Sequence, residues 1–161
     1  MRVYIPATHR GLRDLVAWGG LGPTPLCGFA VTGALRESYA AGDEEELEYV
    51  AMTAAARSAL TLLARADDEP PRRVVLAVDV DDARPVPDLG AAAVELPRVV
   101  PLRQVAAVHM DTAEAESDVA AAVEVLRAGG PRDADDEFLL DSCEAHELAW
   151  FGTQEIGDLL A

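Results

Sequence analysis

The sequence predicts one globular domain over residues 1–161, α+β (or α/β) in class, with a mixed sheet of about four to six strands packed by about four to five helices. Three observations support this prediction. Short β-type runs are interspersed with longer segments of helical periodicity. Half of the residues are hydrophobic, which is enough for one core in a chain of this length. There is no internal repeat, and no linker is long enough to divide the chain.

The first quarter of the chain predicts two strands and two helices. Residues 2–6 form a β-type run, and Thr8 then caps a helix that stops at Gly19. After a loop rich in Gly and Pro, residues 27–31 predict a second strand. Thr32 follows as the cap of a short helix.

The middle of the chain predicts the longest helix and a buried strand. Asp43 and Glu46 have the spacing of a capping box, which opens a helix over residues 44–66. Its wide apolar face indicates that the helix lies across a sheet. The run 74–80 is apolar without alternation, which is typical of a strand that is buried on both faces.

Further strands are predicted for residues 91–96 and 105–110, with one helical turn within residues 100–104. Asp111 and Glu114 then form a second capping box, which starts a helix that ends before a Gly-Gly-Pro turn.

The C-terminal segment predicts an acidic loop, a helix and a helical tail. The loop covers residues 133–137. Asp141 and Glu144 have capping-box spacing again, and we expect the last long helix over residues 142–151. Gly152 breaks that helix, and a short helical tail follows.

The charge of the chain excludes several classes of function. All 13 basic residues are Arg, and 29 acidic residues give a net charge of −16. No basic cluster exists to contact phosphates, so we expect no nucleic-acid partner. The absence of Lys removes the usual phosphate-binding loop and all Schiff-base chemistry. Abundant Ala and Arg, with no Lys or Asn, indicate the codon bias of a GC-rich genome.

Membrane and export signals are also missing from the sequence. No window reaches the roughly 18 apolar residues that a membrane span needs, and no signal peptide is recognisable. We therefore expect a cytoplasmic protein without a membrane partner. Cys27 and Cys143 are then expected to be reduced thiols.

The candidate catalytic residues are Cys143, His146 and Glu147, which would share one face of the predicted last helix together with Trp150. Cys143 and His146 could act as nucleophile and base, because a thiolate near a helix N-terminus is favoured by the helix dipole. The alternative is a structural helix that places Cys143 and Trp150 in the core. We favour this alternative because two side chains at helical spacing are a weak signal for a catalytic site.

Asp79 and Asp81 are candidate metal ligands, because they stand where a buried strand ends. They resemble the aspartate pair of haloacid-dehalogenase-like phosphatases. That family continues with a Gly/Thr-containing turn and uses a Lys or Arg elsewhere, whereas residues 83–85 here read Ala-Arg-Pro and Lys is absent. A solvated turn is the favoured alternative.

The candidate binding residues are Arg36, Tyr39 and Trp150. Arg36 and Tyr39 could line a binding surface on the short second helix, although surface charges of this kind also serve solubility alone. Trp18, Trp150 and Phe151 could instead form an apolar patch for homo-oligomer assembly.

Three segments carry a resemblance to a known family: Met1–Thr8, Ala34–Tyr49 and His146–Ile156. They are similar to a family of small actinobacterial proteins that form a domain of unknown function. The resemblance implies an actinobacterial cytoplasm and no particular catalytic residue.

The function that the sequence favours is a non-enzymatic interaction or regulatory domain that binds a partner protein, with no cofactor, because strong structural signals accompany no complete catalytic motif. The alternative is a small hydrolase or metal-dependent enzyme that uses Cys143, His146 and Glu147, or Asp79 and Asp81.

Overall fold

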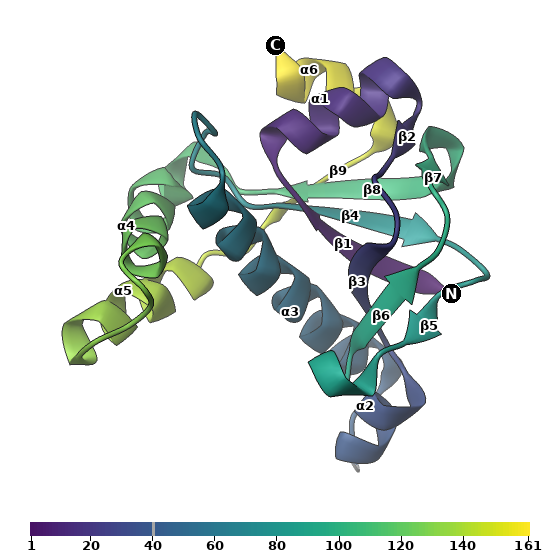
Figure 1. Cartoon of the computed structure of the whole chain (residues 1–161), viewed down its shortest axis with the longest axis horizontal. Helices are drawn as coiled ribbons and strands as arrows, with labels where there is room; N and C mark the ends of the chain where they lie inside the picture. Colours follow the sequence, from purple (N-terminus) through teal and green to yellow (C-terminus); the bar gives the residue numbers. More distant parts are fainter. Residues whose placement is uncertain (40) are drawn as a thin grey trace.

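The computed structural model describes residues 1–39 and 41–161, and its centre is an antiparallel sheet (Figure 1). In the described chain this sheet has seven strands in the order β5-β6-β3-β1-β4-β8-β9, and every neighbouring pair is antiparallel. The strands are β1 (Arg2–Ala7), β3 (Leu26–Ala30), β4 (Val74–Asp79), β5 (Arg84–Pro85), β6 (Ala93–Leu96), β8 (Val105–Met110) and β9 (Ala149–Phe151). A separate two-stranded ribbon joins β2 (Gly20–Leu21) to β7 (Val100–Pro101).

The predicted α+β class is confirmed, and the predicted numbers of strands and helices are corrected. The sheet is antiparallel rather than mixed, and its described part exceeds the four to six strands expected. The six helices of the described chain also exceed the four to five expected; they are α1 (His9–Trp18), α2 (Gly33–Ser38), α3 (Glu44–Arg65), α4 (Glu116–Arg127), α5 (Ala134–Glu144) and α6 (Ile156–Leu160). Strands as short as β5 and β9 carry too few residues for a hydrophobic period to be recognised.

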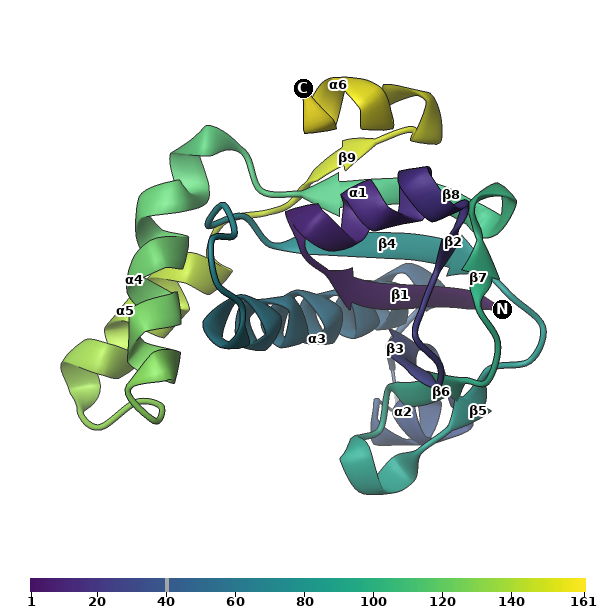
Figure 2. The same cartoon turned by 45° about the horizontal axis from the view of Figure 1, so that its top comes forward.

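Helices cover both faces of the sheet (Figures 1 and 2). Alternate residues of β1 point to opposite faces, so Val3 and Ile5 join the core beneath α1 and α6, whereas Tyr4 joins the core beneath α3. The long helix α3 lies across β1, β3 and β4. It follows that the central strands are buried from both sides, as the apolar run in β4 predicts.

Helix α3 contacts the sheet through small side chains. Asp43 caps it by accepting a hydrogen bond at Oδ1 from the Glu46 amide at 2.9 Å, as predicted. Ala51, Ala55 and Ala59 are fully buried along the helix. Ala51 and Ala55 belong to the same core cluster as Ala77 of β4, and their small side chains let α3 lie close to the sheet.

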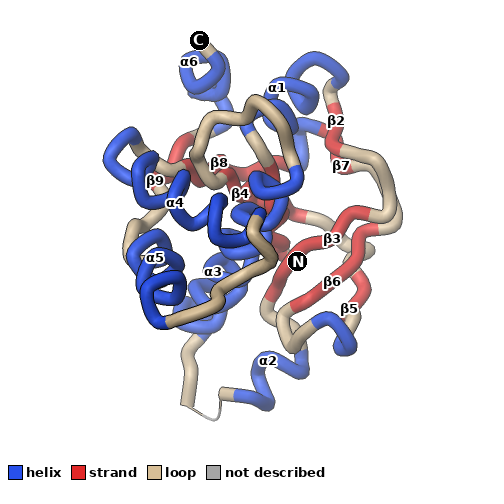
Figure 3. Tube along the Cα trace, turned by 60° about the vertical axis from the view of Figure 1, so that its left-hand side comes forward, coloured by secondary structure: helices blue, strands red, loops and turns tan. Residues whose placement is uncertain are grey.

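A third layer forms beyond one end of the sheet, where α4 and α5 pack against the C-terminal half of α3 (Figure 3). Leu60 and Leu63 of α3 meet Val119 of α4 and Cys143 of α5 in one buried cluster. This layer fixes the position at which the chain leaves α5 and approaches β9.

The C-terminal predictions need correction. The acidic segment 133–137 is not a loop, because the Asp133 side chain accepts a hydrogen bond from the Asp136 amide and starts α5 there. That helix ends at Glu144, so the helix predicted for residues 142–151 is wrong. Ala149–Phe151 is extended as β9, because pairing with β8 satisfies the backbone groups on the side of the strand that faces β8.

One glycine lies where a side chain would collide with the core. A Cβ on Gly28 would lie 2.6 Å from Val3 Cγ1 and 3.3 Å from the Tyr4 carbonyl oxygen. We expect Gly28→Ala to lower the free energy of unfolding by about 1–3 kcal/mol, measured by urea denaturation, because overpacking a buried strand forces neighbours to shift. Gly157→Ala in α6 is the control, since its Cβ would meet open space. Equal stability of the two variants would contradict the prediction.

Candidate functional site

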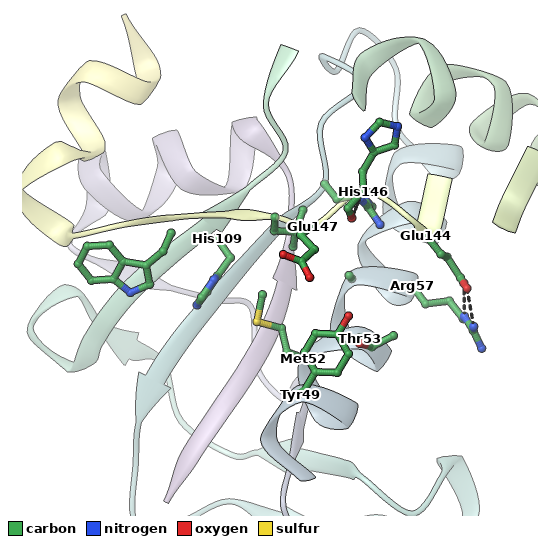
Figure 4. Close-up of a pocket in the computed structure, with 12 residues that line it drawn as sticks. Tyr49, Met52, Thr53, Arg57, His109, Glu144, His146 and Glu147 are labelled. Carbon is green, nitrogen blue, oxygen red and sulfur yellow. Dashed lines mark hydrogen bonds and ion pairs between the residues drawn. The ribbon is translucent and has the colours of Figure 1, made fainter. Parts of the chain in front are cut away.

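A cavity of about 380 Å³ lies between α3, β8 and the segment that connects α5 to β9 (Figure 4). The three walls come from distant parts of the sequence, and packing brings them together. Residues from α3 form one wall, His109 of β8 contributes to the floor, and the segment 144–150 forms the other wall. The lining side chains are those of Tyr49, Met52, Thr53, Ala56, Arg57, Arg73, His109, Glu144, His146, Glu147, Leu148 and Trp150.

Aromatic rings and a thioether give the cavity its apolar character. Trp150 on β9 stands directly opposite His109 on β8, so both side chains point to the face that α3 covers. Tyr49 and Met52 approach from α3. Tyr49 and Trp150 are each 62% exposed, although both are large aromatic residues. Two accessible rings therefore stand at the cavity.

The arginines at the cavity are both paired within the chain. Arg57 makes a two-pronged ion pair with Glu144, with distances of 2.7 Å from Nε to Oε1 and 3.0 Å from Nη2 to Oε2. Figure 4 shows this pair at one end of the cavity. Arg73 is buried and forms a second two-pronged pair, with Asp111. The cavity therefore presents no unpaired guanidinium among the described residues.

Arg73 also holds the connecting segment in place. Its Nε and Nη2 each donate to Asp111 over 2.8 Å, and Nη2 donates to the His146 carbonyl oxygen over 2.9 Å. Burial alone lowers the pKa of Arg73, but the hydrogen bonds and negative charge of Asp111 outweigh it and keep the guanidinium charged. Asp111 is thus an ion-pair partner rather than the helix cap that the capping-box spacing predicts.

His146 and Glu147 are neighbours in sequence but point in different directions (Figure 4). His146 Nε2 lies 2.7 Å from Asp118 Oδ2 on α4, away from Tyr49 and Met52. The Glu147 carboxylate points into the cavity. Among the described residues, Glu147 makes no hydrogen bond or ion pair of its own. Glu147 is exposed, and it is the charged side chain of the cavity lining that has no ion-pair partner among the described residues.

His109 contributes a neutral ring. Burial lowers its pKa, and the positive charge of Arg2 lowers it further, so the imidazole is uncharged at neutral pH. The ring also contacts Tyr4 edge-on, with centroids 6.4 Å apart. His109 is only partly buried, and part of its side chain lines the cavity.

Cys143, unlike His146 and Glu147, does not line the cavity. Cys143 belongs to the last turn of α5 and is fully buried in the cluster with α3 and α4. Burial raises the pKa of the Cys143 thiol to about 11. The helix-dipole argument for an activated thiolate is wrong, because Cys143 lies at the C-terminal end of its helix.

The candidate metal ligands Asp79 and Asp81 have different surroundings. Arg2 donates to both oxygens of Asp79, over 2.8 and 3.2 Å, and this hydrogen bonding holds the pKa of Asp79 below its ordinary value. Asp81 lines a separate hollow of about 520 Å³ near Trp18. Within residues 1–39 and 41–161, no three His, Cys, Asp or Glu side chains are grouped so that they could hold a metal ion.

The predicted binding residues are also dispersed. Arg36 pairs with Glu44 at 2.7 Å, and neither it nor Tyr39 lines the cavity. Trp150 does line the cavity, whereas Phe151 points to the opposite face and packs against the core beneath α1. Trp18 borders the hollow that contains Asp81. Trp18, Trp150 and Phe151 therefore do not share one surface.

A model described as "Family of unknown function (DUF6912)" matches residues 1–160. The chain belongs to this family. The predicted resemblance to a family of unknown function is thereby confirmed for this DUF6912 chain. Neither the curated proteins nor the solved structures contain a match to it. None of the helices in its described part has the length and hydropathy needed to span a bilayer.

Several cavity residues of this DUF6912 chain were missed by the sequence reasoning. Tyr49, Met52, Thr53 and Arg57 recur at spacings of three and four, so they form a second stripe on α3 beside its buried alanines. That spacing is the one signal in the sequence that could have indicated them. Nothing in the sequence pairs this stripe with His109, because the two meet only through the packing of α3 on the sheet.

Proposed function

We propose that this protein is a non-enzymatic binding domain whose cavity accepts an Arg or Lys side chain of a partner protein. The observation that carries this proposal is the balance of charge at the cavity. Arg57 and Arg73 are paired internally and His109 is neutral, whereas Glu147 points inward without a partner among the described residues. A cation is the group that such a lining attracts.

The aromatic side chains support the same occupant. A cation over the face of Trp or Tyr gains about 0.5–1 kcal/mol at exposed sites and about 2 kcal/mol when desolvated. Trp150 and Tyr49 stand at the cavity with accessible rings, and Met52 offers an apolar surface for the stem of a long side chain. The cavity, of about 380 Å³, has room for an Arg or Lys side chain.

The charge of the whole chain favours a basic partner. A net charge of −16 attracts positively charged proteins over distances longer than any single contact, which raises the rate of association. The enzyme hypothesis lacks a comparable observation, because Cys143 is buried and His146 is bonded to Asp118.

The test uses a Gly/Ser heptapeptide with a central Arg, and the same peptide with citrulline, a neutral isostere. The protein has two Trp residues, so its nitrogen-15 spectrum contains one indole signal from Trp18 and one from Trp150. We expect the Arg peptide to shift the Trp150 signal saturably, and the citrulline peptide to bind about 10-fold more weakly. The Trp18 signal, from a different hollow, is the internal control.

Variants sharpen this test. We expect Glu147→Gln to weaken binding of the Arg peptide about 5-fold or more, since it removes the inward carboxylate. Glu37→Gln on the exposed helix α2, which contributes no residue to the cavity, makes the same change in net charge and should leave the affinity nearly unchanged. Equal binding of the Arg and citrulline peptides, or no shift of the Trp150 signal, would contradict the proposal.

A further inference from the structure

The edge of the sheet at β9 is open within the described chain. β9 pairs with β8 through Ala149–Met110, Trp150–His109 and Phe151–Val108, and it is the last strand in the sheet order. Its outer side therefore carries backbone amide and carbonyl groups without a neighbouring strand. Such an edge is a template for pairing with another chain.

The two edges of the sheet differ in their protection. The opposite edge is β5, whose two residues are Arg84 and Pro85. Pro85 has no amide hydrogen and Arg84 is charged, so that edge resists strand addition. β9 has the sequence Ala-Trp-Phe, with neither a proline nor a charge. This contrast identifies β9 as the edge that is suited to pairing.

The chain after β9 does not follow the edge. It turns at Gly152 and crosses to the face of the sheet that α1 covers, where Ile156 of α6 is buried (Figures 1 and 2). Contacts between α1 and α6 hold it there. The outer side of β9 is therefore not paired by the segment that succeeds it.

The edge is continuous with the cavity described above. Trp150 is the central residue of β9 and lines the cavity, and Glu147 precedes the strand by two residues. Alternate side chains of a strand added along β9 would point to the same face as Trp150. One of these side chains would stand beside the aromatic rings and the Glu147 carboxylate.

We infer that the partner binds as an extended basic segment, which adds as a further strand along β9 and directs one Arg or Lys side chain into the cavity. This inference rests on the proposed function and adds the conformation of the partner to it. Backbone hydrogen bonds along β9 supply affinity, and the cavity selects the side chain. β9 is three residues long, so a pentapeptide spans the edge.

Modification of the peptide backbone separates strand addition along β9 from binding of the basic side chain in the cavity. The parent probe is an acetylated and amidated Thr-Val-Arg-Val-Thr peptide. In an added strand only alternate amides face β9. The amides of the two Val residues therefore face one side of the added strand, and the amide of Arg faces the other. N-methylation of both Val residues and N-methylation of Arg alone remove donors from opposite sides of the peptide. We expect one of these changes to weaken binding about 10-fold, because it removes hydrogen bonds, and the other to have an effect below about 2-fold.

A second readout is local to the edge. We expect the parent peptide to slow amide hydrogen exchange in residues 149–151 on the side facing away from β8. If both N-methylated peptides bind equally while Arg still exceeds citrulline, strand addition is wrong and the proposed function survives. If no peptide with Arg shifts the Trp150 signal, the proposed function itself fails.

Discussion

Replacement of Asp111 by Ala should lower the free energy of unfolding by about 3–5 kcal/mol, which is the cost of leaving a buried charge unpaired. The side chains of Arg73 and Asp111 are 3% and 0% exposed. In the variant, the Arg73 guanidinium would keep its positive charge in a buried environment. Arg73 would also lose the three hydrogen bonds that it donates to Asp111, two from its guanidinium and one from its backbone amide. Urea denaturation of the variant and the wild type gives the difference directly.

Two further variants make this result specific to the buried pair. Replacing both partners, with Arg73→Met and Asp111→Leu, should restore a large part of the lost stability, because no charge is then left in the core. Arg36→Ala removes an ion pair in which both side chains are 54% exposed, and its effect should stay below about 1 kcal/mol. If Asp111→Ala lowers the free energy of unfolding no more than Arg36→Ala does, the buried Arg73–Asp111 pair does not have this structural role.

Alkylation of Cys143 in the folded protein should be at least about 100-fold slower at neutral pH than alkylation of the same thiol in denaturant. Burial raises its pKa from 9.0 to about 11. A pKa raised by about two units lowers the thiolate fraction at neutral pH about 100-fold, and the thiolate is the reactive form. The fully buried position slows the reagent further. The measurement is the rate with iodoacetamide in a Cys27→Ser variant.

The pH dependence gives this prediction a second test. Because the folded-state pKa is raised, the rate for Cys143 should still increase tenfold per pH unit between pH 9 and 10, whereas a free thiol levels off there. The Cys143→Ser variant retains Cys27, which is exposed and serves as the reference for an accessible thiol. A rate for folded Cys143 that matches this reference would indicate an activated nucleophile and would revive the enzyme hypothesis.

Local signals at helix starts were the part of the fold that the sequence predicted well. Thr8, Thr32 and Asp43 each accept a hydrogen bond from an amide three residues later, as expected from their position. A cap needs only residues that are close in sequence, so a short motif determines it. The antiparallel sheet and its strand order depend instead on pairing between distant segments, such as β1 with β4.

The C-terminal third shows how a local signal misleads when several compete. Asp133, Asp141 and their following acids all fit the start of a helix, and the structure uses Asp133. Asp111 also fits a cap, yet its carboxylate pairs with Arg73, which lies 38 residues earlier. A local sequence motif cannot indicate an ion pair between residues that lie so far apart in the chain. For Asp111, a tertiary contact therefore overrides the local capping motif.

The candidate site was predicted only in fragments. Glu147 and Trp150 were singled out as neighbours on a helix, and they do lie at one cavity, but a connecting segment and β9 carry them. Tyr49 and His109 lie far from them in sequence and have no motif of their own. Their role follows from the packing of α3 across the sheet.

The alanines of α3 change how the composition of this chain is understood. Codon bias accounts for the high number of alanines in the chain. An exposed residue such as Ala128 could be replaced without structural consequence. Ala51 and Ala55 are different, because they are fully buried against the sheet, and a larger side chain there would push α3 away from it and displace the cavity wall that the helix forms. Mutation can therefore change the exposed alanines freely, whereas the packing around them restricts the buried alanines of α3 and those of the strands, such as Ala30 and Ala77.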